Sequence, residues 1–315
     1  MTHSVLDGFP IANPLLHDIK RMNETFHGEG YLFFRDVLDR DAVLRVKRDF
    51  VSALEGQGVT RQGETEPFWT GVGLEGIDDN SLYALDSYQS LIESKTTREL
   101  IERIFGEPVF TYRNTDIRFA LPNDARHQTP AHQDHFFIRQ TDRFRTAWIP
   151  LMEIDPDMGG LALAPRSHQR GLLDHVEHET AYSYIFRGRK QRGVPSESVP
   201  AHWLTTHYRP GDLLVFHSLM VHWALPNTSD RIRLSLDTRY QPLSEPRTWQ
   251  AEKTILELRR YRQEVRGIAL AAGLSKEQFE ALLIEMMKRG LEADERNVQS
   301  VQQELGYDTK RLPCS

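Results

Sequence analysis

The stretch TPAHQDHFFIRQ, residues 129–140, places a histidine and a carboxylate close together, at His132 and Asp134. Imidazole nitrogen and carboxylate oxygen are donors that suit iron(II) among other divalent ions, and a site of two histidines and one carboxylate leaves three positions open for small ligands. Residues two apart on an extended strand share a face. We therefore expect a strand that projects both side chains together, with Phe136 and Phe137 excluding water beside them. For so short a pattern taken alone, a hydrogen-bonded structural pair is the commoner explanation.

A complete metal site needs a third ligand from another part of the chain. The stretch GDLLVFHSLMVHWALPNTSDRIRLSLDTRY, residues 211–240, offers two candidates, His217 and His222. Residues 213–217 read as a buried strand that follows a turn at Gly211. Strand alternation by itself does not choose between the two histidines.

The end of that stretch, RIRLSLDTRY, alternates regularly between polar and apolar residues. One face of the expected strand carries Arg231, Arg233, Ser235, Asp237 and Arg239. Alternation alone favours a half-exposed strand with a solvated charged face. The alternative is a barrel interior in which an arginine and a serine hold an acidic co-substrate, because a guanidinium matches a carboxylate through two hydrogen bonds.

The elements that must position these residues change character along the chain. The first third reads as helices around one strand, because its apolar residues fall at helical spacing and glycines end the runs. We expect helices over 17–30, 39–58 and 96–106, and a strand over 31–38. From about residue 108 the period changes to two, with short apolar runs separated by Gly, Pro and Asp. That pattern is typical of an all-β barrel or jelly roll.

Two more helices are expected after the barrel, over 248–273 and 275–290, the second with a capping box formed by Ser275 and Gln278. Its apolar stripe is expected to pack against the barrel or a second subunit rather than to bind a ligand; the stripe comprises Phe279, Leu282, Leu283, Met286 and Met287. The expected fold class is α+β with a mainly β core, a double-stranded β-helix flanked by N-terminal and C-terminal helices. Residues 1–246 would form the barrel domain and 247–315 a helical extension.

Bulk composition excludes some classes of function. The chain has 315 residues and a formal net charge of −6, so no general affinity for nucleic acid is expected. Its one cysteine, Cys314, cannot form an internal disulfide, which favours a reducing compartment and a cytoplasmic location. We find neither a signal peptide nor a run of 18 apolar residues, so no membrane association is expected.

Five segments in this order resemble the phytanoyl-CoA dioxygenase family of iron(II)- and 2-oxoglutarate-dependent oxygenases. The resemblance spans about residues 20–242; its segments are GEGYLFFRDVLDRDAV, HQD at 132–134, AWIPLMEID at 147–155, GGLALAPRSHQRG at 159–171, and residues 211–240. It implies that His132, Asp134 and His222 hold the metal, since the family's distal histidine shortly precedes a Pro-Asn-x-Ser segment. His217 would then be structural.

The resemblance also implies a co-substrate site. Arg233 occupies the place of the arginine that binds the distal carboxylate of 2-oxoglutarate, eleven residues after the distal histidine. Trp148 falls where the family has an aromatic residue on the barrel wall, and Ser235 recreates an Arg-x-Ser pair of related oxygenases. Ala224 departs from the family, because many members have a small hydroxylated residue there. Asp134 speaks against halogenation, since related halogenases replace this carboxylate with a small residue.

The implied activity is a non-haem dioxygenase that uses Fe(II), 2-oxoglutarate and O2. It would hydroxylate or otherwise oxidise an unactivated C–H bond of a small polar or amphiphilic molecule, releasing succinate and CO2. A metal-dependent barrel enzyme that does not use 2-oxoglutarate and a non-catalytic ligand-binding relative are the alternatives. Besides the small-molecule substrate, the partner we expect is a second copy of the chain, held through the C-terminal helices.

The sequence says less about the substrate. Two basic runs are candidates for binding an acidic group, with solvated loops as the equal alternative: Arg139, Arg143 and Arg145, and Arg187, Arg189, Lys190 and Arg192. The segment from about 172 to 200 is long and rich in polar and aromatic residues, which indicates a lid over the barrel mouth.

Overall fold

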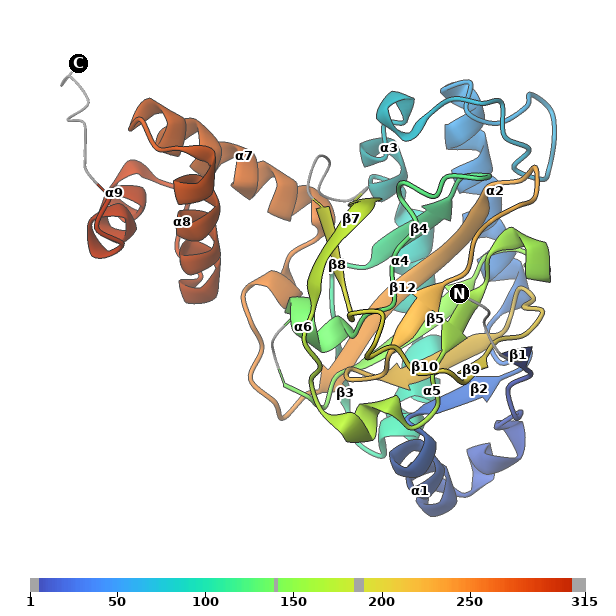
Figure 1. The fold of residues 1–315 in the computed structure, drawn as a ribbon. Helices are drawn as coiled ribbons and strands as arrows, with labels where there is room; N and C mark the ends of the chain where they lie inside the picture. The colour runs from blue at the N-terminus through green and yellow to red at the C-terminus, as the bar shows by residue number, and fades with distance from the viewer. Residues whose placement is uncertain (1–5, 139–140, 184–189, 308–315) are drawn as a thin grey trace. The chain divides into compact units, whose positions relative to one another are not determined.

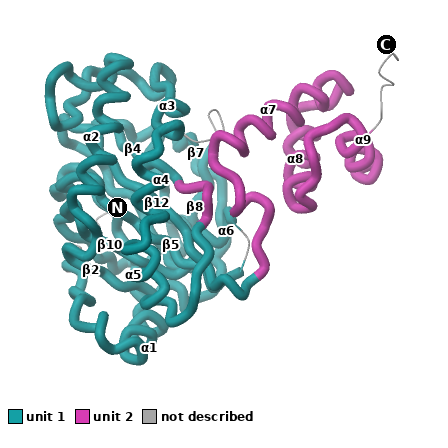
Figure 2. The backbone as a smooth tube through the Cα atoms, turned by 180° about the vertical axis from the view of Figure 1, so that it is seen from behind, with its two compact units in different colours: residues 1–111, 116–245 teal, residues 112–115, 246–315 magenta. Residues whose placement is uncertain are grey.

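A computed structural model describes residues 6–138, 141–183 and 190–307. The chain divides into two compact units, coloured separately in Figure 2. The first comprises Met1–Thr111 and Asp116–Glu245, and the second comprises Tyr112–Thr115 and Pro246–Ser315. The expected boundary lay between residues 246 and 247, without the 112–115 segment. The assignment of separate domains stays a prediction.

The first third of the chain forms the predicted helices and strand. Helix α1 (Ile19–Glu29) ends at Gly30, whose φ of 84° is the left-handed conformation that glycine adopts without strain. Strand β2 (Tyr31–Phe34) follows directly. Helix α2 (Arg40–Gly56) begins where the Asp39 carboxylate accepts a hydrogen bond from the Ala42 amide. Helix α5 (Lys95–Phe105) is also present, whereas the short helices α3 (Asn80–Tyr83) and α4 (Asp86–Ile92) were not predicted.

The first unit contains two main sheets, and the strands of the larger one are labelled in Figure 1. The larger follows the order β2-β10-β5-β12-β3, and β4 also pairs with β12. Its further strands are β3 (Val109–Thr111), β4 (Asp116–Ala120), β5 (Arg145–Pro150), β10 (Leu213–His217) and β12 (Arg233–Pro242). The smaller follows the order β1-β9-β6-β11, with strands β1 (Leu6–Asp7), β6 (Leu161–Leu163), β9 (Trp203–Leu204) and β11 (His222–Ala224). Apart from the parallel β1–β9 pair, neighbouring strands in both sheets are antiparallel. This is the predicted double-stranded β-helix.

Strand β12 is buried over its whole length, which corrects the expectation of a solvated charged face. On one side Tyr240 donates a hydrogen bond to the carbonyl of Ile92 at the end of α4, 3.2 Å away, so the N-terminal helices cover that face. Because side chains alternate along a strand, the polar residues of β12 point to the opposite side, into the barrel.

The segment predicted to be a lid contains a two-stranded sheet, β7 (Val176–Tyr182) paired with β8 (Lys190–Gly193). Tyr184 to Arg189 lie outside the described residues. The remaining short helices are Asn13–His17, Leu74–Gly76, Pro156–Met158, Ser167–Arg170, Gln250–Glu252 and α6 (Asp134–Ile138). None of the helices in the described part of the chain is long and apolar enough to cross a membrane.

The second unit consists mainly of α7 (Ile255–Ala271), α8 (Lys276–Arg289) and α9 (Glu295–Glu304). The predicted capping box of α8 is present. Helix α9 was not predicted, and it changes the packing of the apolar stripe on α8. Four stripe residues form a core with side chains of α7 and α9, and Met287 packs at its edge. The stripe is therefore covered within the unit itself.

Candidate metal centre

His132 and Asp134 do not lie on one strand, which corrects the expected alternation. His132 forms an antiparallel bridge with His222, in which each amide donates to the other's carbonyl over 3.0 Å. Asp134 is the first residue of helix α6. The turn into this helix, and not strand alternation, brings the carboxylate beside the imidazole of His132.

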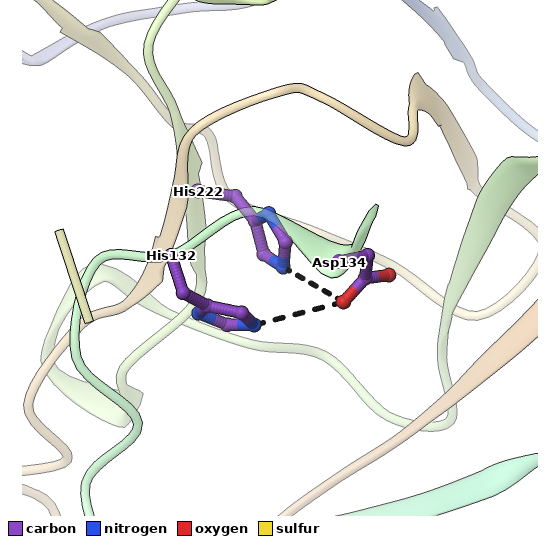
Figure 3. Close-up of side chains that lie close together, drawn as sticks. All are labelled: His132, Asp134 and His222. Atoms are coloured by element: carbon purple, nitrogen blue, oxygen red, sulfur yellow. Dashed lines mark ion pairs between the residues drawn. The ribbon is translucent and has the colours of Figure 1, made fainter. Parts of the chain in front are cut away.

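The side chains of His132, Asp134 and His222 point toward one another, as Figure 3 shows. The Nε2 atoms of His132 and His222 lie 3.6 and 3.7 Å from Oδ1 of Asp134. The two imidazole rings are 4.1 Å apart between centroids. All three residues are buried, at 5, 4 and 3% exposure respectively. Among the described residues, this is the group of His, Cys, Asp or Glu side chains that can hold a metal ion.

Hydrogen bonds fix the tautomer of both histidines. Nδ1 of His132 contacts the carbonyl of Pro130 at 2.8 Å, and Nδ1 of His222 contacts the carbonyl of Met220 at 3.0 Å. A carbonyl only accepts, so each Nδ1 carries the proton and each Nε2 presents a lone pair in the neutral ring. Burial first, and then the neighbouring His132, lowers the pKa of His222 to about 3. Two lone pairs and a carboxylate oxygen therefore converge, and this donor set fits a divalent cation.

The second oxygen of Asp134 has partners of its own. Oδ2 accepts a hydrogen bond of 2.6 Å from the Thr146 hydroxyl, and Nε and Nη2 of Arg239 each lie 3.4 Å from it. Burial alone would raise the pKa of Asp134. The charge of the Arg239 guanidinium is the largest of the effects that outweigh burial and hold this pKa well below its usual range. Sequence reasoning placed Arg239 on the polar face of β12 but assigned it no role.

Arg239 also begins a buried chain of alternating charges. Its Nη1 donates to Asp116 over 2.9 Å. Arg118 contacts the same Asp116 carboxylate at 3.3 Å and Asp237 at 2.5 Å. These residues come from β4 and β12, which pair directly. The order is therefore carboxylate, guanidinium, carboxylate, guanidinium, carboxylate, from Asp134 to Asp237.

A cavity of about 290 Å³ opens onto the two histidines. Its wall includes Trp148, Arg118, Asp237 and Arg233. Arg233 is 4% exposed, and it donates hydrogen bonds to the Gly159 carbonyl at 3.2 Å and to the Ser235 hydroxyl at 2.7 Å. The structure thus brings the predicted co-substrate arginine to the same cavity as the histidines.

Trp148 and Ser235 support this cavity in different ways. Trp148 is 1% exposed, and its ring packs edge-on against Tyr208 with 4.6 Å between centroids. Ser235 is fully buried, and its hydroxyl accepts the hydrogen bond from Arg233. Ala224, the departure from the family pattern, also lines the cavity.

His217, the rejected ligand candidate, lies elsewhere. It ends β10, where its Nδ1 accepts a hydrogen bond from the Leu219 amide at 3.0 Å and its ring stacks on Phe26 at 6.1 Å.

The two phenylalanines that follow Asp134 have different surroundings. Phe136 stacks on His175 with 4.2 Å between ring centroids, whereas Phe137 is 53% exposed and its ring lies 5.6 Å from that of His132.

Two described residues of the predicted basic runs, Arg143 and Arg145, make structural contacts. Arg143 pairs with Glu107 and Glu245, and Arg145 donates to the Ile104 carbonyl over 2.7 Å. Neither arginine lines the cavity. Arg139, Arg187 and Arg189 lie outside the described residues.

A family model described as phytanoyl-CoA dioxygenase (PhyH) matches residues 26–235. The chain belongs to the phytanoyl-CoA dioxygenase family. It is a non-haem oxygenase that depends on Fe(II), 2-oxoglutarate and O2, and the convergent histidines and carboxylate agree with this class. The resemblance inferred from the five segments is confirmed.

Two similar proteins are 1-deoxypentalenic acid 11-beta-hydroxylases. The one from Streptomyces arenae is 35% identical over 76% of this chain and 87% of its own length. The one from Streptomyces exfoliatus is 33% identical over 80% of this chain and 90% of its own length.

Solved structures with low sequence identity share the fold. EvdO2 from Micromonospora carbonacea var. aurantiaca, complexed with 2-oxoglutarate, aligns with a TM-score of 0.51 at 18% identity, over 77% of this chain and 96% of its own. The non-haem monooxygenase ThoJ aligns with a TM-score of 0.53 at 14% identity, over 74% of this chain and 86% of its own.

Proposed function

We propose that His132, Asp134 and His222 ligate the iron(II) ion of this oxygenase. The observation that carries the assignment is the convergence of two Nε2 lone pairs and one carboxylate oxygen within 4.8 Å of one another. Without a cation, three electron-rich atoms would face each other in a buried site, which is unfavourable. The hydrogen bonds to the Nδ1 atoms orient both rings for this task.

We further propose that Arg233 binds the distal carboxylate of 2-oxoglutarate. Its buried guanidinium lines the same cavity as the two histidines, and a carboxylate is the anion that its planar donor pair matches. Ser235 and Gly159 hold the guanidinium in place. Trp148 supplies an apolar wall beside the co-substrate. A direct contact from the Ser235 hydroxyl to 2-oxoglutarate stays a prediction.

The substrate we propose is an amphiphilic carboxylic acid with an apolar carbon skeleton. The supporting observations are the named substrate of the two similar hydroxylases, 1-deoxypentalenic acid, and a cavity wall that mixes apolar and polar residues. The apolar part of the wall includes Leu74, Phe119, Leu121, Leu161 and Leu225. These side chains would hold the skeleton against the metal centre and keep water away from the C–H bond that reacts.

The residues of the chain supply binding, orientation and exclusion of water. The bound metal and O2 supply the oxidising chemistry, with 2-oxoglutarate converted to succinate and CO2. Asp134 contributes negative charge at a fixed point, because its pKa lies well below the usual range and the carboxylate stays ionised. The neutral His222 needs no deprotonation before it binds a metal at neutral pH, since burial lowers its pKa to about 3.

The test is substrate-dependent oxidation by the purified protein. We would supply Fe(II), 2-oxoglutarate and O2 with a panel of cyclic and linear carboxylic acids, and measure succinate and a product heavier by one oxygen atom. His132→Ala and Asp134→Ala should abolish both signals, whereas His17→Ala, at an exposed position, should leave them unchanged. Undiminished turnover in both site variants would overturn the metal assignment.

We also propose two properties that were expected from the sequence, a homodimer and a cytoplasmic location. Homodimerisation through the C-terminal helices is supported by the exposed side chains of Leu270 and Ile284, which are 53 and 50% exposed. Light scattering at several concentrations tests it, and a monomer mass throughout would refute it. A cytoplasmic location rests on the lone cysteine, Cys314.

A further inference from the structure

The two oxygens of the Asp134 carboxylate have different surroundings. Oδ1 lies 3.6 and 3.7 Å from the Nε2 atoms of His132 and His222. Oδ2 faces away from them, toward three donors: the Thr146 hydroxyl at 2.6 Å and two nitrogens of Arg239 at 3.4 Å each. One oxygen is therefore directed to the metal site, and the other is taken up by the protein.

The donors to Oδ2 are fixed by the sheet. Arg239 on β12 and Thr146 on β5 are direct partners across the antiparallel ladder, so the register of two central strands places both side chains together. They point to the same side, because paired residues on neighbouring strands share a face. The position of these donors does not depend on a bound ion.

Further charges hold Arg239 in place. Its Nη1 donates to Asp116 over 2.9 Å, and Arg118 contacts Asp116 in turn. Thr146 is fully buried, and Arg239, Asp116 and Asp134 are 6, 9 and 4% exposed. A buried charge that loses its partner is strongly unfavourable, so the guanidinium has little freedom to leave either carboxylate.

We propose that Arg239 and Thr146 are positioning residues that restrict Asp134 to binding the metal through Oδ1 alone. A carboxylate can bind a cation through one oxygen or through both. Binding through both would occupy a fourth coordination position, and the reaction needs three open positions for 2-oxoglutarate and O2. Hydrogen bonds to Oδ2 oppose that change. This inference rests on the proposed metal assignment.

The experiment counts metal-bound water in the absence of oxygen. Mn(II) replaces iron, and the relaxation rate of water protons reports how many waters the bound ion carries. The binding of 2-oxoglutarate to the Mn(II) protein is titrated in parallel. Thr146→Val removes one donor and preserves the side-chain shape, and Arg239→Lys keeps the charge but loses the planar donor pair. Thr97→Val, at a buried threonine that helps cap α5, is the matched control.

The expected result is about three bound waters in the wild-type protein and about two in Thr146→Val and Arg239→Lys. Affinity for 2-oxoglutarate should fall roughly 3- to 10-fold. Losing one hydrogen bond to Oδ2 of Asp134 favours binding of the metal through both oxygens by about that factor, and this competes with the co-substrate. Thr97→Val should resemble the wild type in both measurements. If Arg239→Lys does not fold, Thr146→Val decides alone.

A wild-type water number in Thr146→Val would overturn the inference, even if the variant were less stable, because a purely structural role changes the melting temperature and not the coordination. Failure of the wild-type protein to bind Mn(II) would instead refute the proposed function. The two failures are therefore distinguishable.

Discussion

Replacing Arg233 by glutamine should selectively weaken the binding of 2-oxoglutarate. Glutamine keeps much of the side-chain length and can still donate to an oxygen, but it removes the charge and the planar pair of donors. The guanidinium is 4% exposed and is held by the Gly159 carbonyl and the Ser235 hydroxyl, both uncharged acceptors. A dianionic co-substrate would bring negative charge beside this buried guanidinium.

The size of the effect follows from that burial. A hydrogen bond to a charged group contributes about 1.5–3 kcal/mol, and truncating one partner of a buried charge pair costs about 2–5 kcal/mol. We expect a loss of about 2–4 kcal/mol, which is roughly a 30- to 700-fold rise in the dissociation constant, since about 1.4 kcal/mol is a factor of ten. Metal affinity in the absence of co-substrate should change little, because Gly159 and Ser235, the partners that hold Arg233, are not among the three proposed ligands.

The assay is an anaerobic titration of the Fe(II) protein with 2-oxoglutarate, followed by the visible absorption of the chelated complex. Arg231→Gln is the matched control: Arg231 lies two residues away, and its side chain pairs with Asp155 and Asp230. Equal affinity in Arg233→Gln and Arg231→Gln would refute the assigned role of Arg233.

Three further predictions follow from the geometry. Gly159→Ala should lower both the melting temperature and the affinity for 2-oxoglutarate, because a Cβ at its φ of +74° would meet the Leu225 carbonyl at 2.4 Å; unchanged values in thermal and binding titrations would contradict this. Burial first lowers the pKa values of His175 and His217 to about 4, so the unfolded chain binds more protons from about pH 6.5 down to 4. The free energy of unfolding, measured with urea, should therefore fall across that window, by at most about 1.4 kcal/mol per pH unit for each histidine, and a flat profile would show the reasoning to be wrong. Ser275→Ala should destabilise the C-terminal helices by about 1 kcal/mol without changing turnover, and a kinetic effect would argue against a purely structural cap.

Local signals were sufficient for most helices. The capping box at Ser275 and Gln278 and the glycine after α1 act within a few residues, so the sequence contains the information directly. The short helices α3 and α4 escaped prediction, since each is too brief to develop a helical period. Helix α9 also escaped it, and with it the partner of the α8 stripe.

Prediction of the site residues and of the burial of β12 was limited, because both depend on contacts between residues that are far apart in the sequence. Alternation could not choose between His217 and His222, because the choice depends on which sheet each histidine joins: His217 ends a strand of the large sheet, and His222 begins one in the small sheet. The family resemblance supplied that choice. Asp134 and Arg239 are 105 residues apart, and only the folded barrel brings them together. For the same reason β12 was first interpreted as half-exposed, although helices cover one of its faces.

The most direct test of the central claim is to locate the metal in crystals grown without oxygen in the presence of Fe(II) and 2-oxoglutarate. An anomalous difference map recorded at the iron absorption edge should show one strong peak at about 2.0–2.2 Å from Nε2 of His132, Nε2 of His222 and Oδ1 of Asp134, the range that the same donor atoms show with another divalent metal, zinc. A peak elsewhere, or one beyond bonding distance of any of these three atoms, would contradict the account.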